Sequence, residues 1–385
     1  MALKLAERMR EIAPFRVMAI LEAARAREAA GYDVIHLEVG EPDFATPPAI
    51  VEAGRRALAD GRTFYSAAQG LPELRRAISR WYAERYRVDV SPERILVTPG
   101  ASGALMVALA LLVGDGDEVV MADPTYPCNR HFVSLYGGTP VSVPAGPDSR
   151  YQLTAPMLAE AWGARTVAAM VASPANPTGG VLSAAEIKGL AEVCRDRGGA
   201  LIVDEIYHGL TYGCDAASAL QVADDALVIN SFSKYFQMTG WRLGWLVVPE
   251  ALVEPATRLA QNLYLCAPAP AQAAALAAFE ADTIALLEER RAEFARRRDF
   301  LVDALPRLGW KLPVVPDGAF YLYADVSAVT DDSLAYCARI LEEADVAITP
   351  GLDFGQHRAN THVRIAYTTG VDRLAEAVER IARLG

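Results

Sequence analysis

Three short apolar runs decide the fold: Val167-Ala168-Ala169-Met170-Val171, Leu201-Ile202-Val203 and Leu227-Val228-Ile229. A helical pattern at residues 184–195 separates the first two runs. Short, nearly continuous apolar strands with helices between them are typical of a parallel sheet that is buried on both faces. The stretch therefore predicts an α/β fold. Ligands of such sheets bind at the carboxyl ends of the strands.

The same alternation extends outward from this stretch. Further helices are expected at residues 15–30, 48–60, 71–85 and 102–113, and further strands at 95–98, 118–121 and 244–248. After Pro270 the character changes to a long charged helix at 282–305, followed by short strands and helices. We expect a large α/β domain at residues 45–285. Residues 1–44 and 286–385 would form a smaller α+β domain, with the N-terminal helix packed on its second part.

The composition excludes several classes of protein. The chain has 385 residues, of which 52% are hydrophobic and 22% are charged, so an intrinsically disordered protein is excluded. Its net charge of −11 argues against nucleic acid or an anionic membrane as a partner. The five cysteines form no Cys-x-x-Cys pair, so neither a disulfide framework nor a metal site is expected. No signal peptide or membrane span is expected either, and we predict a cytoplasmic protein.

Several common catalytic motifs are absent from the sequence. No lysine follows a glycine, so there is no phosphate-binding P-loop. The patterns G-x-G-x-x-G, G-x-S-x-G and H-E-x-x-H are also missing. Nucleotide hydrolysis, nicotinamide-dependent hydride transfer, serine hydrolysis and zinc proteolysis are therefore not supported.

Two uncharged motifs follow predicted strands. Gly100-Ala101-Ser102-Gly103 comes after residues 95–98 and opens a helix, whose free N–H groups suit a phosphate. An ordinary glycine-rich helix start would look the same. Asn176, in Asn176-Pro177-Thr178-Gly179, follows residues 167–171, and the proline keeps it out of the helical region. Its amide would point off the end of the strand, although a plain turn would also explain the motif.

Charged residues follow the next two strands. Asp204 follows residues 201–203, where a carboxylate is costly without a partner. A protonated heterocyclic nitrogen, a helix N-terminus or a salt bridge would each provide that partner. Lys234, in Ser231-Phe232-Ser233-Lys234, follows residues 227–229; desolvation there would lower its pKa and favour a Schiff base. Arg242 lies eight residues further on and could hold a phosphate. The convergence of these motifs on one sheet edge indicates a functional site.

The ordered motifs resemble those of the class I/II aminotransferases, which are fold-type I enzymes dependent on pyridoxal 5'-phosphate. The resemblance extends from about Phe15 to Arg364 and includes Gly40-Glu41-Pro42-Asp43-Phe44 and Asp204-Glu205-Ile206-Tyr207. It implies a mostly parallel seven-stranded sheet covered by helices, with a smaller α+β domain. It also implies ping-pong transfer of an amino group from an L-amino acid to a 2-oxo acid.

The resemblance assigns roles around the cofactor ring. Lys234 would form a Schiff base with the cofactor aldehyde and then move a proton between the substrate Cα and the cofactor C4′. Asp204 would keep the pyridine nitrogen protonated, which makes the ring an electron sink. Asn176 and Tyr207 would bind the ring oxygen, and Tyr126 would stack on the ring.

The resemblance also assigns roles around the phosphate and the substrate. Arg364 would grip the substrate α-carboxylate with a two-pronged hydrogen bond, and Gly40 would allow close approach of the substrate. Tyr65 would reach the phosphate of the neighbouring subunit, which implies a homodimer with shared active sites. The remaining phosphate-binding candidates are Ala101, Ser102, Ser231, Ser233 and Arg242.

The substrate side chain and the reaction outcome stay open at this point. Ser102 stands where some relatives that favour acidic substrates carry a basic residue, and Phe15, Tyr65 and Tyr126 would make the pocket apolar. A C–S β-lyase or a cyclopropane-carboxylate synthase would share the same motifs. A pyridoxal-phosphate-binding transcription regulator would need an added DNA-binding domain, for which the roughly forty residues before Gly40 leave no room.

Overall fold

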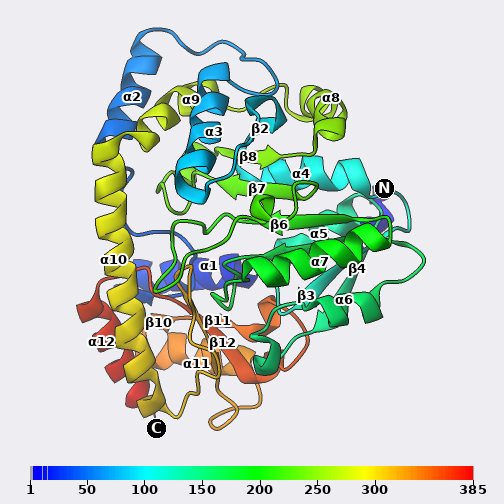
Figure 1. Cartoon of the computed structure of the whole chain (residues 1–385). Coiled ribbons are helices and arrows are strands. Elements are labelled where there is room, and N and C mark those ends of the chain that lie inside the picture. The colour runs from blue at the N-terminus through cyan, green and yellow to red at the C-terminus, as the bar shows by residue number, and fades with distance from the viewer. Residues whose placement is uncertain (1–2, 11, 15, 385) are drawn as a thin grey trace.

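A seven-stranded sheet forms the centre of the molecule (Figure 1). The computed structural model describes residues 3–10, 12–14 and 16–384. The strand order is β2-β8-β7-β6-β5-β3-β4, and all neighbours pair in parallel except β8, which is antiparallel to both β2 and β7. The strands are β2 (Ile95–Thr98), β3 (Glu118–Asp123), β4 (Thr139–Pro144), β5 (Thr166–Ala172), β6 (Ala200–Asp204), β7 (Leu227–Ser231) and β8 (Gly244–Val247). The predicted α/β fold with a mostly parallel sheet is confirmed.

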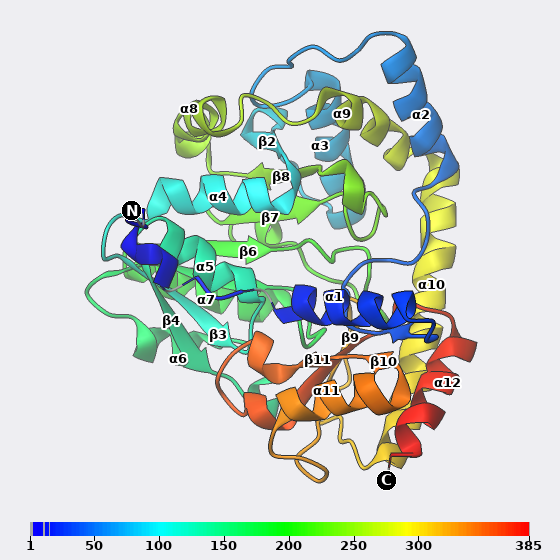
Figure 2. The ribbon, with the colours of Figure 1, turned by 180° about the vertical axis from the view of Figure 1, so that it is seen from behind.

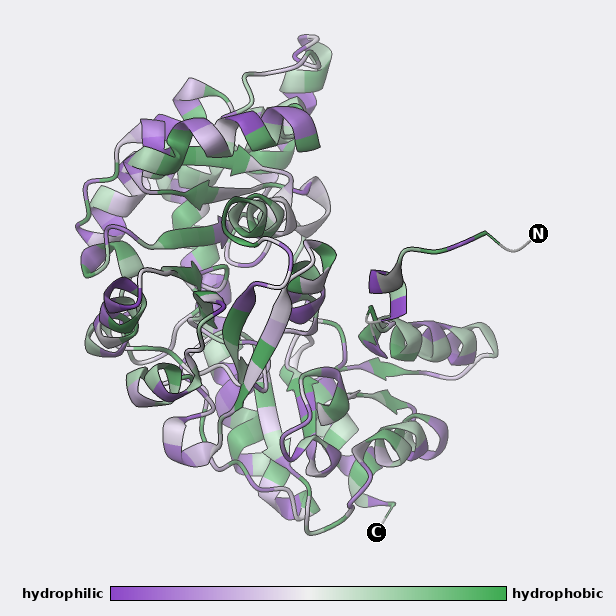
Figure 3. Ribbon diagram, turned by 90° about the vertical axis from the view of Figure 1, so that its right-hand side faces the viewer, coloured by the Kyte–Doolittle hydropathy of each residue, from purple (hydrophilic) through white to green (hydrophobic). Residues whose placement is uncertain are grey.

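Alternate side chains of each central strand enter two different cores. On β6, Val203 belongs to the larger apolar cluster and Ile202 to the cluster on the opposite face. Val228 and Ile229 on β7 divide in the same way. Both faces are dry, so every position of the strand must be apolar, and each buried Val or Ile contributes roughly 1.5–3 kcal/mol. This double burial explains the continuous apolar runs, and Figure 3 shows the central strands as mostly hydrophobic.

Helices cover both faces of the sheet and build the rest of the molecule. The α-helices are α1 (Arg16–Ala29), α2 (Pro48–Ala59), α3 (Pro72–Tyr86), α4 (Gly100–Leu112), α5 (Pro127–Leu135), α6 (Ala155–Ala161), α7 (Ala184–Asp196), α8 (Val253–Leu263), α9 (Ala269–Ala275), α10 (Ala281–Ala304), α11 (Ser333–Ala344) and α12 (Val371–Ala382). The 3₁₀ turns are η1 (Glu7–Arg10), η2 (Pro92–Arg94), η3 (Pro147–Ser149), η4 (Ala219–Gln221), η5 (Thr239–Trp241), η6 (Glu250–Leu252), η7 (Leu276–Phe279), η8 (Leu305–Leu308), η9 (Gly351–Asp353) and η10 (Ala359–Thr361).

Two details of the sheet region differ from the sequence prediction. Helix α4 begins at Gly100, two residues before the predicted start, so the glycine-rich motif is itself the first helical turn. Strand β4 was not predicted. It lies at the edge of the sheet, is only partly buried and contains two prolines, and such a strand lacks the continuous apolar signal.

The C-terminal part holds two small sheets. Strands β11 (Thr349–Pro350), β12 (His362–Ala366) and β9 (Tyr321–Asp325) form an antiparallel sheet, and β1 (Ile35–His36) pairs in parallel with β10 (Val346–Ala347). Helix α1 lies beside β10 and β11, as Figure 2 also shows. Phe15, the predicted first residue of that helix, lies outside the described residues.

The long helix α10 runs along one side of the molecule, from α9 to the C-terminal elements (Figure 1). Its Arg297 is buried and forms a two-pronged ion pair with Asp43, at 2.7 and 3.0 Å. This ion pair fixes Asp43, and with it the Gly40–Phe44 motif, to helix α10.

The domain boundaries at residues 45 and 285 stay a prediction. Within the described part of the chain, no helix is both long enough and apolar enough to cross a bilayer.

Candidate active site

One pocket of about 410 Å³ gathers the predicted site residues at the carboxyl ends of β5, β6 and β7. Tyr65 is the one predicted site residue that does not line it. Its side chain is 82% exposed. The predicted residues that line the pocket are Gly40, Ala101, Ser102, Tyr126, Asn176, Asp204, Tyr207, Ser231, Ser233, Lys234, Arg242 and Arg364.

One end of the pocket is suited to an anion. Helix α4 is preceded by Pro99, which offers no side-chain hydrogen bond to the first turn, so the N–H groups of that turn remain available. The guanidinium of Arg242 lies over Gly100, where a Cβ would come within 2.6 Å of Nη2. Gly100 also has a φ of 70°, which favours glycine. Free amides, a helix N-terminus and a cation together suit a phosphate group.

Two serines border the same end: Ser231 is the last residue of β7, and Ser233 lies in the loop that follows. The hydroxyl of Ser231 accepts a hydrogen bond from the Ser233 backbone N–H at 3.0 Å and donates to the Ser233 hydroxyl at 3.0 Å. Gly244, on β8, packs so closely that a Cβ would lie 2.8 Å from the Ala101 backbone nitrogen. The sheet edge and the helix N-terminus are therefore held tightly together.

Asp204 is a buried carboxylate at the end of β6. Its Oδ1 accepts a hydrogen bond from the Ile206 backbone N–H at 3.1 Å. Burial raises the pKa of Asp204 to about 7, while the Ile206 amide and the charge of Lys234 partly oppose that rise. A cation bound against Asp204 inside the pocket would restore the charged form.

Lys234 lines the pocket from the loop after β7. Its Nζ donates a hydrogen bond to the Gly40 carbonyl at 2.6 Å. The same atom lies 5.8 Å from the ring centre of Phe320 and 5.9 Å from that of Tyr207. Desolvation lowers the pKa of Lys234 to about 8, against the opposing charge of Glu41. A neutral amine is therefore accessible near physiological pH, as nucleophilic and proton-transfer chemistry requires.

Arg364 projects from β12 into the other end of the pocket and is 2% exposed. Its Nη1 donates to Asn176 Oδ1 at 3.0 Å, and its Nη2 donates to the Glu38 carbonyl and to Thr349 Oγ1. Its Nε is buried and has no hydrogen-bond partner among the described residues. The guanidinium also stacks 4.5 Å from the Tyr321 ring centre. Such an immobilised guanidinium suits a carboxylate.

Comparison with known proteins is consistent with this geometry. The chain matches the family described as "Aminotransferase class I and II" over residues 32–381. The chain belongs to the class I and II aminotransferases. It is 41% identical over 372 residues to a valine–pyruvate aminotransferase of Mycobacterium tuberculosis, covering 96% of each chain. It is 36% identical over 395 residues to an aspartate aminotransferase of Geobacillus stearothermophilus, covering 99% of this chain and 98% of the other.

Solved structures agree at the level of the fold. A crystal structure of an aminotransferase from Mycobacterium tuberculosis superposes with a TM-score of 0.96 at 40% identity, covering 100% of this chain and 99% of that one. The predicted family, fold type and enzyme class are confirmed. The protein is an aminotransferase, which transfers amino groups between amino acids and 2-oxo acids.

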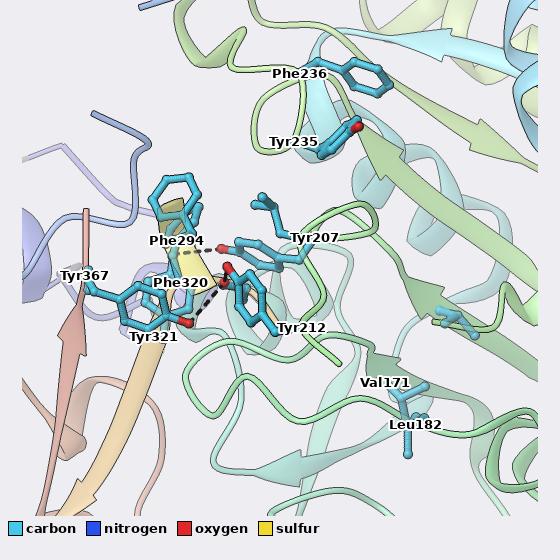
Figure 4. Close-up of a cluster of buried hydrophobic side chains, with 14 of the residues drawn as sticks. Val171, Leu182, Tyr207, Tyr212, Tyr235, Phe236, Phe294, Phe320, Tyr321 and Tyr367 are labelled. Carbon is cyan, nitrogen blue, oxygen red and sulfur yellow. Dashed lines mark hydrogen bonds between the residues drawn. The ribbon is translucent and has the colours of Figure 1, made fainter. Parts of the chain in front are cut away.

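Tyr321 is a residue of this aminotransferase pocket that the sequence did not indicate. Its hydroxyl lies 2.8 Å from that of Tyr207. It also sits over Gly40, where any Cβ would overlap it. Figure 4 shows Tyr321 with Tyr207 and Phe320 in a buried aromatic group. In the sequence Tyr321 is one of two tyrosines in strand β9, and only the three-dimensional pairing reveals its position.

Helix α1 also supplies pocket residues that the sequence did not indicate. Val17 and Met18 lie in its first turn and line the pocket. Leu105, on α4, lines it as well. In the sequence these are ordinary apolar positions of helices, and nothing distinguishes them from core residues.

Gly40→Ala is predicted to damage the pocket. The new methyl group would overlap the Tyr321 hydroxyl and displace it from Tyr207, at a cost of about 2 kcal/mol in the free energy of unfolding. We expect a lower melting temperature and weaker substrate binding. Gly146→Ala is the matched control, because a Cβ there meets open space. Equal melting temperatures and equal KM values for the two variants would contradict the prediction.

Proposed function

We propose that this aminotransferase binds pyridoxal 5'-phosphate in the pocket and uses Lys234, Asp204 and Tyr207 as its catalytic residues. The observation that carries the proposal is that a desolvated amine and a buried carboxylate line the same pocket, which also holds an anion-binding helix end. When bound, the cofactor supplies an aldehyde that condenses with amines and a ring that withdraws electrons from the substrate Cα. The substrates are an L-amino acid and a 2-oxo acid.

The chemistry of the donor set fits the cofactor at both of its charged ends. The first turn of α4, with Ala101 and Ser102, together with Ser231 and Arg242, would hold the phosphate, and Ser233 is a further candidate. Asp204 would hold the proton on the ring nitrogen. The ring oxygen would be bound by Asn176 and Tyr207, with Tyr126 against the ring face.

Lys234 would act as the base and acid at the substrate Cα. Its amine, with a pKa lowered to about 8, can change its protonation state near neutral pH at a small free-energy cost. Arg364, fixed by Asn176 and by the Glu38 carbonyl, would hold the α-carboxylate and so orient the Cα–H bond toward Lys234. The missing Cβ of Gly40 leaves room for the Tyr321 hydroxyl, and the substrate would approach the backbone there.

A titration of the cofactor-free protein with pyridoxal phosphate tests the proposal. We expect saturable binding with a new visible absorbance band. A single donor amino acid should bleach that band and release one equivalent of 2-oxo acid, and an added 2-oxo acid should restore it. Release of pyruvate and ammonia from a cysteine conjugate, with no lasting loss of the band, would indicate a β-lyase instead. No binding would contradict the proposal.

We further propose a homodimer in which Tyr65 reaches the phosphate site of the neighbouring subunit. Tyr65 and Phe64 are 82% and 84% exposed, and neither lines its own pocket. Mixing inactive Lys234→Ala subunits with weakened Tyr65→Ala subunits would build one intact site in each hybrid dimer. Activity above that of either variant alone is expected, and the absence of recovery would contradict a shared site. The cytoplasmic location stays a prediction.

Asp204→Asn is predicted to stabilise the cofactor-free protein at alkaline pH while abolishing amino transfer. The folded-state pKa of Asp204 is raised to about 7, so the folded state loses stability as pH rises from about 4 through 7. An asparagine avoids this loss of roughly 2–4 kcal/mol. Urea unfolding should show a larger stability gain of the variant over the wild type at pH 8 than at pH 5, because only part of the loss has occurred at pH 5. Exposed Asp331→Asn is the control, and equal gains at both pH values would refute the assignment.

A further inference from the structure

The charged groups of the pocket leave no cation for a second carboxylate. Among the described lining residues the cations are Lys234, Arg242 and Arg364, and the proposed function uses all three. Of the two anions, Asp204 faces the ring nitrogen in that proposal, and Glu41 remains. Within one subunit, a side-chain carboxylate would thus be desolvated without an ion-pair partner, which costs several kcal/mol.

Glu41 adds a further negative charge to the pocket lining. It is exposed at the pocket, and its carboxylate accepts a hydrogen bond from the Thr239 hydroxyl, another lining residue. The hydrogen bond holds the exposed carboxylate beside the pocket. An acidic substrate would approach this charge, whereas a neutral substrate would not be repelled.

Apolar side chains occupy the same region. Val17 is buried at 4% exposure, whereas Met18, its neighbour, is 53% exposed. Both line the pocket together with Leu105. A large apolar side chain that is half exposed at a pocket gains stability when another apolar group covers it, by about 25 cal/mol per Å². A hydrocarbon side chain of the substrate would provide that cover.

Helix α1, which carries Val17 and Met18, is held near both of its ends by hydrogen bonds. The Arg16 backbone N–H donates to Asp353 Oδ1 at 3.1 Å, and Arg27 binds Asp345 Oδ1 through Nε at 2.9 Å and Nη2 at 2.6 Å. The buried Ala24 anchors the middle of the helix in a small apolar cluster. Val17 and Met18 are therefore parts of a fixed wall.

We infer that this aminotransferase prefers amino acids with neutral, apolar side chains, and that Val17, Met18 and Leu105 contact those side chains. The inference rests on the proposed function, because it places the α-carboxylate on Arg364 and the phosphate on Arg242. It also predicts monocarboxylic 2-oxo acids as the products of the donor half-reaction.

L-leucine and L-aspartate provide the direct test, since their side chains have similar shapes and differ in charge. Single-turnover rates of the cofactor-loaded enzyme with each donor require no acceptor. We expect kcat/KM for leucine to exceed that for aspartate by ~100-fold. An equal or higher value for aspartate would overturn the inference, for example because a partner subunit contributes a cation, while leaving the proposed function intact. No cofactor binding and no reaction with either donor would instead overturn both.

Binding of unreactive analogues gives a second readout. The amine-free counterparts of leucine and aspartate are 4-methylpentanoate and succinate, and calorimetry measures their affinity without turnover. We expect 4-methylpentanoate to bind ~10-fold more tightly to the cofactor-loaded enzyme. Tighter binding of succinate would contradict the inference.

A charge introduced at Met18 tests the residue assignment. Met18→Arg should shift the leucine-to-aspartate ratio toward aspartate by ~10-fold, because it supplies the missing cation. Met18→Leu keeps the apolar surface and should leave the ratio within about twofold. The same ratio for wild type and Met18→Arg would show that Met18 does not contact the substrate side chain.

Discussion

Lys234→Ala is expected to lose at least ~10⁴-fold in amino transfer, because the protein would lose both the amine that condenses with the cofactor and the base at Cα. The structure gives the reason for the size of the effect. Among the lining residues that the structure describes, Lys234 is the one lysine, and none of the others offers a side-chain amine. Purified variant protein should lack the visible band of the wild type, even when it is supplied with pyridoxal phosphate. Stopped-flow absorbance with a donor amino acid measures both properties.

Lys188→Ala is the matched control for that experiment. Lys188 lies on α7 with its side chain 61% exposed, and its Nζ is 3.8 Å from Glu192. A solvated pair of this kind contributes little to stability, so activity and absorbance should be unchanged. Retention of a large part of the wild-type rate by Lys234→Ala would exclude Lys234 as the catalytic amine.

Arg364→Ala is expected to lower kcat/KM for amino acids by ~10³-fold, since a buried charge-assisted hydrogen bond to the carboxylate disappears. The loss should be confined to substrates that carry an α-carboxylate. Comparing phenylalanine with phenylethylamine, which lacks that group, isolates the effect in steady-state assays. Arg364→Lys keeps the positive charge but cannot form the two-pronged hydrogen bond, so it should recover only part of the loss in kcat/KM.

The folded state needs a separate control in this case, because Arg364 also binds Asn176 and the Glu38 carbonyl. Thermal unfolding of the variant identifies any general destabilisation. If Arg364→Ala reduced the rates for phenylalanine and phenylethylamine equally, Arg364 would be a structural residue and not the carboxylate site.

The central sheet could be predicted from the sequence because its strands are buried on both faces. Leu201-Ile202-Val203 sends alternate side chains into two cores, so no polar residue interrupts the run. Edge strand β4 has one weakly buried side and two prolines, and it carries no such signal. The residues after the strands could also be predicted, since parallel strands deliver their carboxyl ends to one edge. Asp204 and Lys234 accordingly share one pocket.

The remaining pocket residues depend on contacts between distant segments. Val17 and Met18 reach the site because Asp353 and Asp345, more than 300 positions away, fix α1 beside it. Tyr321 matters through its hydroxyl contact with Tyr207 and its closeness to Gly40. A single sequence contains no local pattern for such contacts. Tyr65 was predicted from the family resemblance alone, and within one chain it lies away from the pocket.

Borohydride reduction of the cofactor-loaded enzyme, followed by peptide mass spectrometry, tests the central claim most directly. The chain has only four lysines, Lys4, Lys188, Lys234 and Lys311, so the site of attachment can be read without ambiguity. We predict a stable phosphopyridoxyl group on Lys234 and on none of the other three. Attachment at another lysine, or no attachment to a protein saturated with pyridoxal phosphate, would contradict the account.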